Sequence, residues 1–249
     1  MKKSVWTDSI KLPEFPKADK EMKTEVLIIG GGICGILCAY MLEQKGIDYI
    51  LVEGSRIGYG ITKNTTAKIT SQHGLIYNKL IKSVGREKAQ MYLSANEKAL
   101  REYRLIAENI DCDFETKDAY VYSINDRKKI EDEVSAVNSL GFNAEFASET
   151  SLPFKTAGAV KFKNQAQFNP MKFLNEIVKG LNIYENTFIT DISENWTKFD
   201  GGKILADKII VATHFPFINK HGSYFIKMYQ KRSYVIAFEN ADNVDGMYI

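Results

Sequence analysis

A cluster of glycines between an apolar segment and a helical one restricts the fold of this chain more than any other feature of its sequence. Residues 26–35 read V-L-I-I-G-G-G-I-C-G, so Gly30, Gly32 and Gly35 fill the pattern G-x-G-x-x-G. In such a turn the first glycine lets the chain leave a strand sharply. The second lets a phosphate group approach the backbone, and the third lets the following helix pack closely on the strand. A helix N-terminus, with its partial positive charge and free N–H groups, suits a bound diphosphate.

The residues around the glycines predict a complete strand–helix–strand unit. The apolar run at 26–29 indicates a buried parallel strand, 33–44 a helix that Gly46 ends, and 49–53 a second buried strand. The second strand ends in Glu53, whose carboxylate suits ribose hydroxyls and would repel a 2′-phosphate, so NADP is disfavoured. The unit has the expected length of about 30 residues. The alternative is a turn without a ligand, in which three successive glycines cost entropy without a packing benefit. The expected dinucleotide site comprises Gly30, Gly32, Ile33, Cys34, Gly35, Glu53 and Gly54.

The composition is that of an ordinary globular protein. Of the 249 residues, 45% are hydrophobic and 26% charged, and 33 basic side chains against 31 acidic ones leave a net charge of +2. This balance gives no support to a nucleic-acid partner or a membrane surface. The three cysteines include no C-x-x-C pair, so we expect neither a disulfide framework nor a zinc site, and a reducing compartment. The N-terminus lacks the apolar region of a signal peptide, and the apolar run at 26–42 is short and glycine-rich. We therefore expect a cytoplasmic protein without stable membrane insertion.

The elements expected after the first unit form a long excursion. From the loop after Glu53 to about residue 187 the pattern gives mainly helices before strands of the Rossmann kind return. The helices are expected over 79–84, 87–109, 127–140 and 170–180. The strands are expected over 119–124, 159–162, 187–192, 203–205, 208–213 and 234–238. The fold class is therefore α/β, with a Rossmann-like domain that is split in the sequence.

Several stretches give the chain a resemblance to a known family. They are S-V-W-T-D-S at 4–9, the glycine segment at 26–35, N-T-T-A-K-I-T-S-Q-H-G at 64–74, Q-A-Q-F-N-P at 165–170, V-A-T-H-F-P-F at 211–217 and G-M-Y-I at 246–249. On these stretches the chain resembles the D-amino-acid-oxidase-like superfamily of FAD-dependent oxidoreductases. It is similar in particular to a bacterial branch whose full-length members often carry a C-terminal Rieske iron–sulfur domain. The resemblance covers nearly the whole chain. The stretches at 64–74 and 211–217 are far more specific for this superfamily than the glycine pattern.

The resemblance implies FAD as the cofactor and adds residues to its site. It places the loop after the second strand around the pyrophosphate and the flavin edge, where hydroxyls, N–H groups and the charge of Lys68 can contact the cofactor. A solvated, threonine-rich turn is the alternative. It places the backbone of 184–192 against the adenine, and the strand end at 212–214 over the cofactor, where His214 replaces a glycine. The residues so implied are Thr65, Thr66, Ala67, Lys68, Ile189, Ala212, Thr213 and His214. His73 is either near the flavin or a hydrogen-bonded loop residue.

The resemblance also implies a second domain and a longer protein. We expect the FAD-binding Rossmann-like domain at 1–75 and 150–219, and a partial, mixed α+β substrate domain at 76–149 and 220–249. Superfamily members continue with the rest of the substrate domain and a final glycine-rich segment that touches the flavin. Since this sequence contains neither these nor a set of Rieske ligands, we expect an incomplete fold.

The expected function is that of an FAD-dependent oxidoreductase. Its substrate would be a small molecule, an amine or amino acid by analogy with the superfamily, oxidised by hydride transfer to N5 of the flavin. No catalytic acid or base is identified. Oxygen, an iron–sulfur domain and a quinone stay open as electron acceptors. The alternatives are an NAD-linked dehydrogenase, since Glu53 fits NAD equally well, and a non-catalytic, incomplete flavoprotein fragment.

The remaining candidates favour structural interpretations. Cys34 and Cys38 have helical i, i+4 spacing, which is more consistent with small buried residues at a helix–sheet contact than with a redox or metal pair. His214 and His221 lack identifiable partner ligands, so no metal-binding residue is expected.

Overall fold

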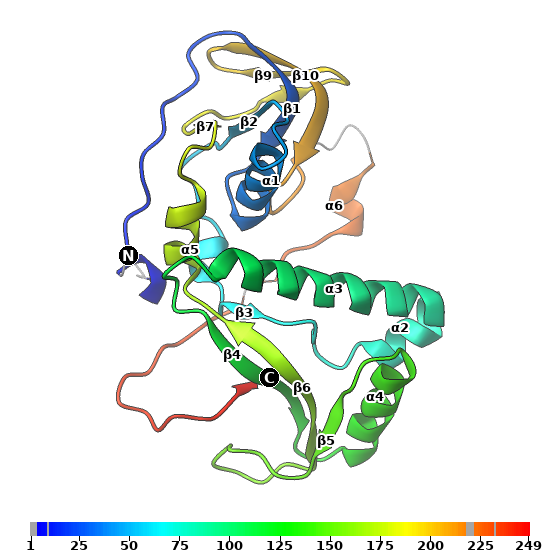
Figure 1. The fold of residues 1–249 in the computed structure, drawn as a ribbon. Coiled ribbons are helices and arrows are strands. Elements are labelled where there is room, and N and C mark those ends of the chain that lie inside the picture. The colour runs from blue at the N-terminus through cyan, green and yellow to red at the C-terminus, as the bar shows by residue number, and fades with distance from the viewer. Residues whose placement is uncertain (1–3, 9, 218–221, 232) are drawn as a thin grey trace. The chain divides into compact units, whose positions relative to one another are not determined.

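The computed structural model describes residues 4–8, 10–217, 222–231 and 233–249 (Figure 1). The chain divides into two compact units, each built from two separate segments of the sequence. Unit 1 consists of Met1–Thr66 and Pro170–Ala237, and unit 2 consists of Ala67–Asn169 and Phe238–Ile249.

The boundaries of these units differ from the expected ones. Residues 67–75 and 150–169, which the sequence assigned to the nucleotide domain, lie in unit 2, because strands β3 (Lys68–Ile69) and β6 (Gly158–Gln167) pair with each other there. Residues 222–237, expected in the substrate domain, belong to unit 1. His221 lies outside the described residues.

A six-stranded sheet forms the centre of unit 1, in the order β7-β2-β1-β10-β9-β8. Its strands are β1 (Met22–Ile29), β2 (Tyr49–Val52), β7 (Ile183–Tyr184), β8 (Asp191–Ile192), β9 (Trp196–Phe199) and β10 (Gly202–Val211). Strand β1 pairs in parallel with β2 and β10, and β2 pairs in parallel with β7. Strands β9 and β8 continue the sheet in antiparallel pairs. The carboxyl ends of the parallel strands therefore meet at one edge, which is where open α/β sheets bind their ligands.

The sequence explains why β1 and β2 lie inside this sheet. All four residues of β2 and the last four of β1 are buried, as in a parallel strand covered on both faces. The core around them contains Ala18, Leu27, Ile29, Ile50, Val52, Ile189, Phe199, Ile204 and Ala206. Helix α1 (Ile33–Glu43) follows Gly32 directly, which confirms the predicted strand–helix–strand unit. The other helical elements of unit 1 are η1 (Val5–Thr7), η2 (Thr62–Asn64), α5 (Pro170–Ile177) and α6 (Tyr224–Lys227).

Unit 2 contains a five-stranded sheet and three helices. The strands follow the order β11-β4-β6-β3, and β5 pairs with β6. Besides β3 and β6, the strands are β4 (Glu115–Ser123), β5 (Glu145–Ala147) and β11 (Met247–Tyr248). The helices are α2 (Tyr77–Val84), α3 (Arg86–Ala107) and α4 (Arg127–Ser139). Most pairs are antiparallel, but β11 lies parallel to β4.

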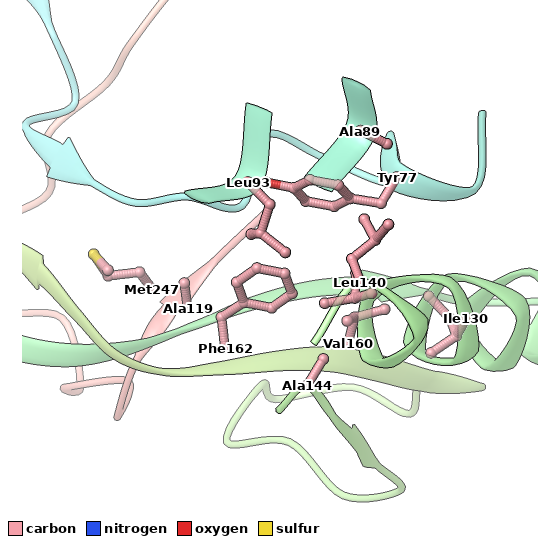
Figure 2. Packing of buried hydrophobic residues seen from close by; sticks show 11 residues of the cluster. Tyr77, Ala89, Leu93, Ala119, Ile130, Leu140, Ala144, Val160, Phe162 and Met247 are labelled. Atoms are coloured by element: carbon pink, nitrogen blue, oxygen red, sulfur yellow. The ribbon is translucent and has the colours of Figure 1, made fainter. Parts of the chain in front are cut away.

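The core of unit 2 lies between this sheet and its helices. Figure 2 shows the ring of Phe162 directed from β6 toward Tyr77 and Leu93 of the helices. The rings of Phe162 and Tyr77 are stacked, with centroids 6.2 Å apart, and Phe142 packs against Phe162 at 4.7 Å. The hydroxyl of Tyr77 donates a hydrogen bond to the backbone oxygen of Ser71, so its one polar atom is paired inside the core.

Two strand predictions in the second half of the chain are wrong. The strand expected over 187–192 is reduced to β8, and β7 lies before it. The chain does not continue a ladder between them, because the N–H of Glu185 bonds to Pro16 O and those of Asn186 and Thr187 bond to Ser55 O and Glu53 O. The segment 234–238 forms no strand, because no strand among the described residues pairs with it. In addition, one strand, β10, contains most of the two separate strands that were expected over 203–205 and 208–213. Among the described helices, none combines the length and the apolar character that crossing a bilayer requires.

Candidate nucleotide-binding site

The turn between β1 and α1 is packed so tightly that two of its positions accept only glycine. Gly30 has a φ of +113°, and a methyl group there would lie 2.9 Å from the backbone of Ala212. A methyl group at Gly35 would lie 1.9 Å from the carbonyl oxygen of Gly30. The turn is therefore held between the end of β1, the start of α1 and the residues after β10, with Ala212 donating its N–H to Ile29 O at 2.8 Å.

The space above Gly32 is open. The nearest atom to a methyl group at this position is Thr62 Oγ1, at 3.5 Å. Thr62 Oγ1 also accepts the N–H of Ile33, at 3.0 Å, one of the N–H groups that an α-helix leaves without an intrahelical acceptor. Since a hydroxyl keeps one proton to donate, Thr62 can offer it to an acceptor such as a phosphate oxygen. Cys34 is exposed in the same first turn of α1 and Cys38 is half-buried, so the expectation that both are buried at a helix–sheet contact is wrong for Cys34.

Glu53 joins the end of β2 to the glycine turn. One carboxylate oxygen accepts the N–H of Gly31 at 2.7 Å, and the other accepts the N–H of Ser55 at 2.8 Å. A carboxylate has about four lone-pair positions, so acceptor capacity is left for the hydroxyls of a ribose. The negative charge of Glu53 is compatible with ribose hydroxyls and would oppose a 2′-phosphate, so its part in a nucleotide site stays a prediction.

The segment after β7 borders the same edge of the sheet. The N–H of Thr187 bonds to Glu53 O at 2.9 Å, and a methyl group at Gly54 would lie 2.9 Å from the ring of Phe188. Phe188 is 65% exposed beside Gly54, whereas the side chain of Ile189 is buried in the core. Ile189 can therefore offer only its backbone to a ligand, and Phe188 is an aromatic surface that sequence reasoning did not single out.

A buried carboxylate fixes the loop that follows Glu53. Glu185 has no exposed side-chain surface, and it accepts the N–H of Ile57 at 2.8 Å and the N–H of Phe15 at 3.1 Å. The guanidinium of Arg56 lies 3.2 Å from Oε2 of Glu185, the same oxygen that accepts the N–H of Phe15. Because Ile57 packs beside Gly31, Glu185 holds one wall of the glycine turn in place.

Three of the expected residues line one cavity of unit 1. Thr65, Thr66 and His214 surround a space of about 880 Å³, in the range of small-molecule sites. N-terminal residues, among them Trp6, and residues between 230 and 237 also line this cavity. Thr213, by contrast, donates its hydroxyl to the carbonyl oxygen of Phe215.

Other expected residues lie in unit 2, so their part in a cofactor site stays a prediction. Lys68 lies on β3 and donates to the carbonyl oxygen of Tyr248 at 3.0 Å, and burial lowers its pKa. Ala67, with a φ of +59°, precedes it. His73 is hydrogen-bonded through Nδ1 to the hydroxyl of Tyr92, at 2.7 Å.

The residues of unit 1 fit a dinucleotide with a diphosphate and a ribose. The space next to Gly32 is open to a phosphate, and the hydroxyl of Thr62 can donate its proton to it. The carboxylate of Glu53 can accept further hydrogen bonds besides the two that it already accepts. The sequence patterns do not identify Thr62, although it lies in the loop after the second strand, which the resemblance places around the pyrophosphate. In the described part of the chain, no three His, Cys, Asp or Glu side chains gather as a metal ion would require.

Parallel strands with this glycine turn between the first of them and its helix, and a carboxylate at the end of the next strand, define a Rossmann-like dinucleotide-binding protein. The chain belongs to the family of FAD dependent oxidoreductases, since the model of that family matches residues 25–248.

Known relatives agree with this assignment. The chain is 36% identical to the "Putative Rieske 2Fe-2S iron-sulfur protein YhfW" of Bacillus subtilis, over 98% of the chain and 51% of that protein. Its structure is similar to those of L-proline dehydrogenase from P. horikoshii and glycine oxidase from Bacillus cereus. The TM-scores are 0.63 and 0.56, the identities 18% and 20%, and the matches cover 78% and 81% of this chain and 54% and 58% of those. The chain thus spans about half the length of the relatives it matches.

Proposed function

We propose that unit 1 binds FAD and that the protein oxidises a small amine or amino acid by transfer of a hydride equivalent to N5 of the flavin. The observation that carries this proposal is the contact between Glu53 and the turn at Gly31, with open space above Gly32 beside it. This arrangement offers N–H and hydroxyl donors to a diphosphate and a carboxylate to the adjoining ribose.

In this proposal the residues of the chain bind and orient the cofactor. The first turn of α1 and Thr62 hold the diphosphate, and Glu53 accepts the ribose hydroxyls. The backbone at Ile189 and the surface of Phe188 border the adenine. Thr65, Thr66 and His214 line the cavity that takes the flavin end. When bound, FAD supplies the redox chemistry, because it accepts two electrons and a proton from the substrate.

The substrate class and the electron acceptor rest on the relatives. L-proline dehydrogenase and glycine oxidase are named for substrates with a C–H bond next to nitrogen, which supports an amine or amino acid here. The name of YhfW favours an iron–sulfur centre as the acceptor of the electrons. Oxygen and a quinone are the alternatives that an experiment has to separate.

Anaerobic mixing with candidate substrates tests this function. The protein is loaded with FAD and mixed with glycine, L-proline, other amino acids and simple amines, while the flavin absorbance near ~450 nm is followed. We expect at least one amine or amino acid to bleach the band, and we expect oxygen, a quinone or an oxidised iron–sulfur protein to restore it at different rates. An FAD-loaded protein that none of these compounds reduces would contradict the proposed substrate class.

A further inference from the structure

The N-terminal segment of unit 1 is attached to the loop that leads to the expected flavin end. The hydroxyl of Ser4 donates to the carbonyl oxygen of Lys63, and the indole N–H of Trp6 donates to the carbonyl oxygen of Thr65, at 2.8 Å. Ser4 also caps η1, by accepting the N–H of Trp6 at 3.3 Å. Two nearby residues of the N-terminal segment thus bond to two carbonyl groups of the loop.

The same segment is anchored again further along. Leu12 is buried beside Gly58, and Arg56 donates to the carbonyl oxygen of Pro13 at 3.1 Å. The N–H of Phe15 bonds to Glu185, and the N–H of Ala18 bonds to the hydroxyl of Thr187 at 3.0 Å. Every one of these contacts lies on the loop after β2 or on the segment after β7, which are the two segments that flank Glu53. The N-terminal segment therefore contacts unit 1 at two places, through Ser4 and Trp6 on the loop at 63–65 and through residues 12–18 on the segments next to Glu53.

Trp6 lines the same cavity as Thr65, Thr66 and His214. Its N–H is donated to Thr65, and the other ring atoms of the indole are carbons, so a contact of this ring with a ligand in that space is apolar. A flat aromatic ring system is the kind of ligand that such a surface favours, through stacked or edge contacts.

We propose that Trp6 is an FAD-binding residue which forms an aromatic wall against the isoalloxazine ring and, through its N–H, holds the backbone of Thr65 in place. This inference rests on the proposed binding of FAD by unit 1. It assigns a ligand contact to a segment that precedes the first strand of the nucleotide fold.

Two kinds of variant separate the roles of the ring and of the N–H group. Trp6→Phe keeps an aromatic surface and loses the hydrogen bond, whereas Trp6→Ala loses both. Trp196→Phe is the matched control, because Trp196 is the second of the two tryptophans and lies on β9 in the same unit. We expect Trp6→Ala to raise the Kd for FAD about tenfold, Trp6→Phe to raise it less, and Trp196→Phe to leave it unchanged. The Kd is measured from the quenching of flavin emission as protein is added.

The Trp196→Phe protein gives a second readout, because Trp6 is then its only tryptophan. We expect FAD to quench the indole emission of this variant with the same midpoint as the flavin signal. If FAD binds and Trp6→Ala retains the wild-type Kd, or if the emission of Trp6 does not change, the assignment of Trp6 is wrong while the proposed function stands. If the wild-type chain binds no FAD, both proposals fail. If circular dichroism shows that Trp6→Ala unfolds at a lower temperature than the wild type, its Kd is not used. The quenching of Trp6 emission by FAD in the Trp196→Phe protein then shows whether Trp6 contacts the flavin.

Discussion

Glu53 accepts a hydrogen bond from the amide of Gly31 at 2.7 Å, and this contact joins the end of strand β2 to the turn after strand β1. The second oxygen of the carboxylate accepts from Ser55 at 2.8 Å, so a single side chain orders both the glycine turn and the start of the next loop. A ligand that bonds to Glu53 is thereby also positioned over the turn.

We expect Glu53→Gln to weaken FAD binding by about tenfold or more. The amide has one acceptor oxygen in place of two, so one of the two backbone N–H groups would face a side-chain N–H, and a ribose would lose an acceptor. The matched control is Asp48→Asn, since Asp48 accepts a backbone N–H from Glu25 at the other end of β2. Isothermal titration with FAD compares the two, and equal losses in both variants would contradict a role for Glu53 in binding.

Gly32→Ala is expected to separate binding from stability. A methyl group at this position meets nothing closer than 3.5 Å, so the fold should keep its melting temperature. It would occupy the space that a diphosphate needs, and we expect the affinity for FAD to fall about 10- to 100-fold.

Variants of two other glycines serve as controls for this experiment. Gly60→Ala is the neutral control, because no atom lies within 4 Å of its added methyl group. Gly35→Ala is the destabilising one, because its methyl group would overlap the carbonyl oxygen of Gly30, and a loss of about 3 kcal/mol or more is expected. Differential scanning fluorimetry reports the stability of all three. An unchanged affinity of the Gly32→Ala protein for FAD would show that no phosphate lies above this residue.

Glu185→Gln is expected to destabilise unit 1. The buried carboxylate accepts two backbone N–H groups and faces Arg56, and an amide would leave one of these N–H groups without its acceptor and remove the charge that faces the guanidinium. We expect a loss of about 2–4 kcal/mol in the free energy of unfolding, measured by urea titration. Glu14→Gln is the control, because Glu14 contacts the same Arg56 but its side chain is 68% exposed, and a loss below about 1 kcal/mol is expected. Comparable losses in the two variants would mean that burial of Glu185 is unimportant.

The three cysteines should differ in their reaction with iodoacetamide. Cys34 is exposed and Cys112 is fully buried, while burial, with a smaller contribution from Cys34, raises the pKa of Cys38. Because the thiolate is the reacting species, a raised pKa means that Cys38 is labelled only as the pH is increased. Mass spectrometry should detect Cys34 first, Cys38 at higher pH and Cys112 last.

Two further measurements test the causes of this order. Cys34→Ala should shift the labelling of Cys38 to lower pH, because it removes the neighbour that adds to the pKa shift. FAD should slow the labelling of Cys34, since this residue lies in the first turn of α1. Labelling of Cys34 at the same rate with and without saturating FAD would contradict a cofactor at that turn.

Local sequence patterns were sufficient to predict the unit from β1 to β2, because the glycine turn and the apolar strands are encoded within about 30 residues. They were not sufficient for the contacts of Glu185, which joins residues 128 and 170 positions away in the sequence. The same limit applies to Trp6 and Thr65, which are 59 positions apart. Nor could pattern alone exclude a strand at 234–238, because a continuous run of apolar, strand-favouring residues does not say whether a partner strand exists.

The absorbance spectrum of the purified chain tests the central claim most directly. We predict bands near ~450 nm after incubation with FAD and removal of the excess, and release of this colour into the supernatant when the protein is precipitated with acid. The Gly32→Ala protein, treated in the same way, should retain much less colour. A wild-type protein that stays colourless after loading with FAD, while keeping a cooperative thermal transition, would contradict the account.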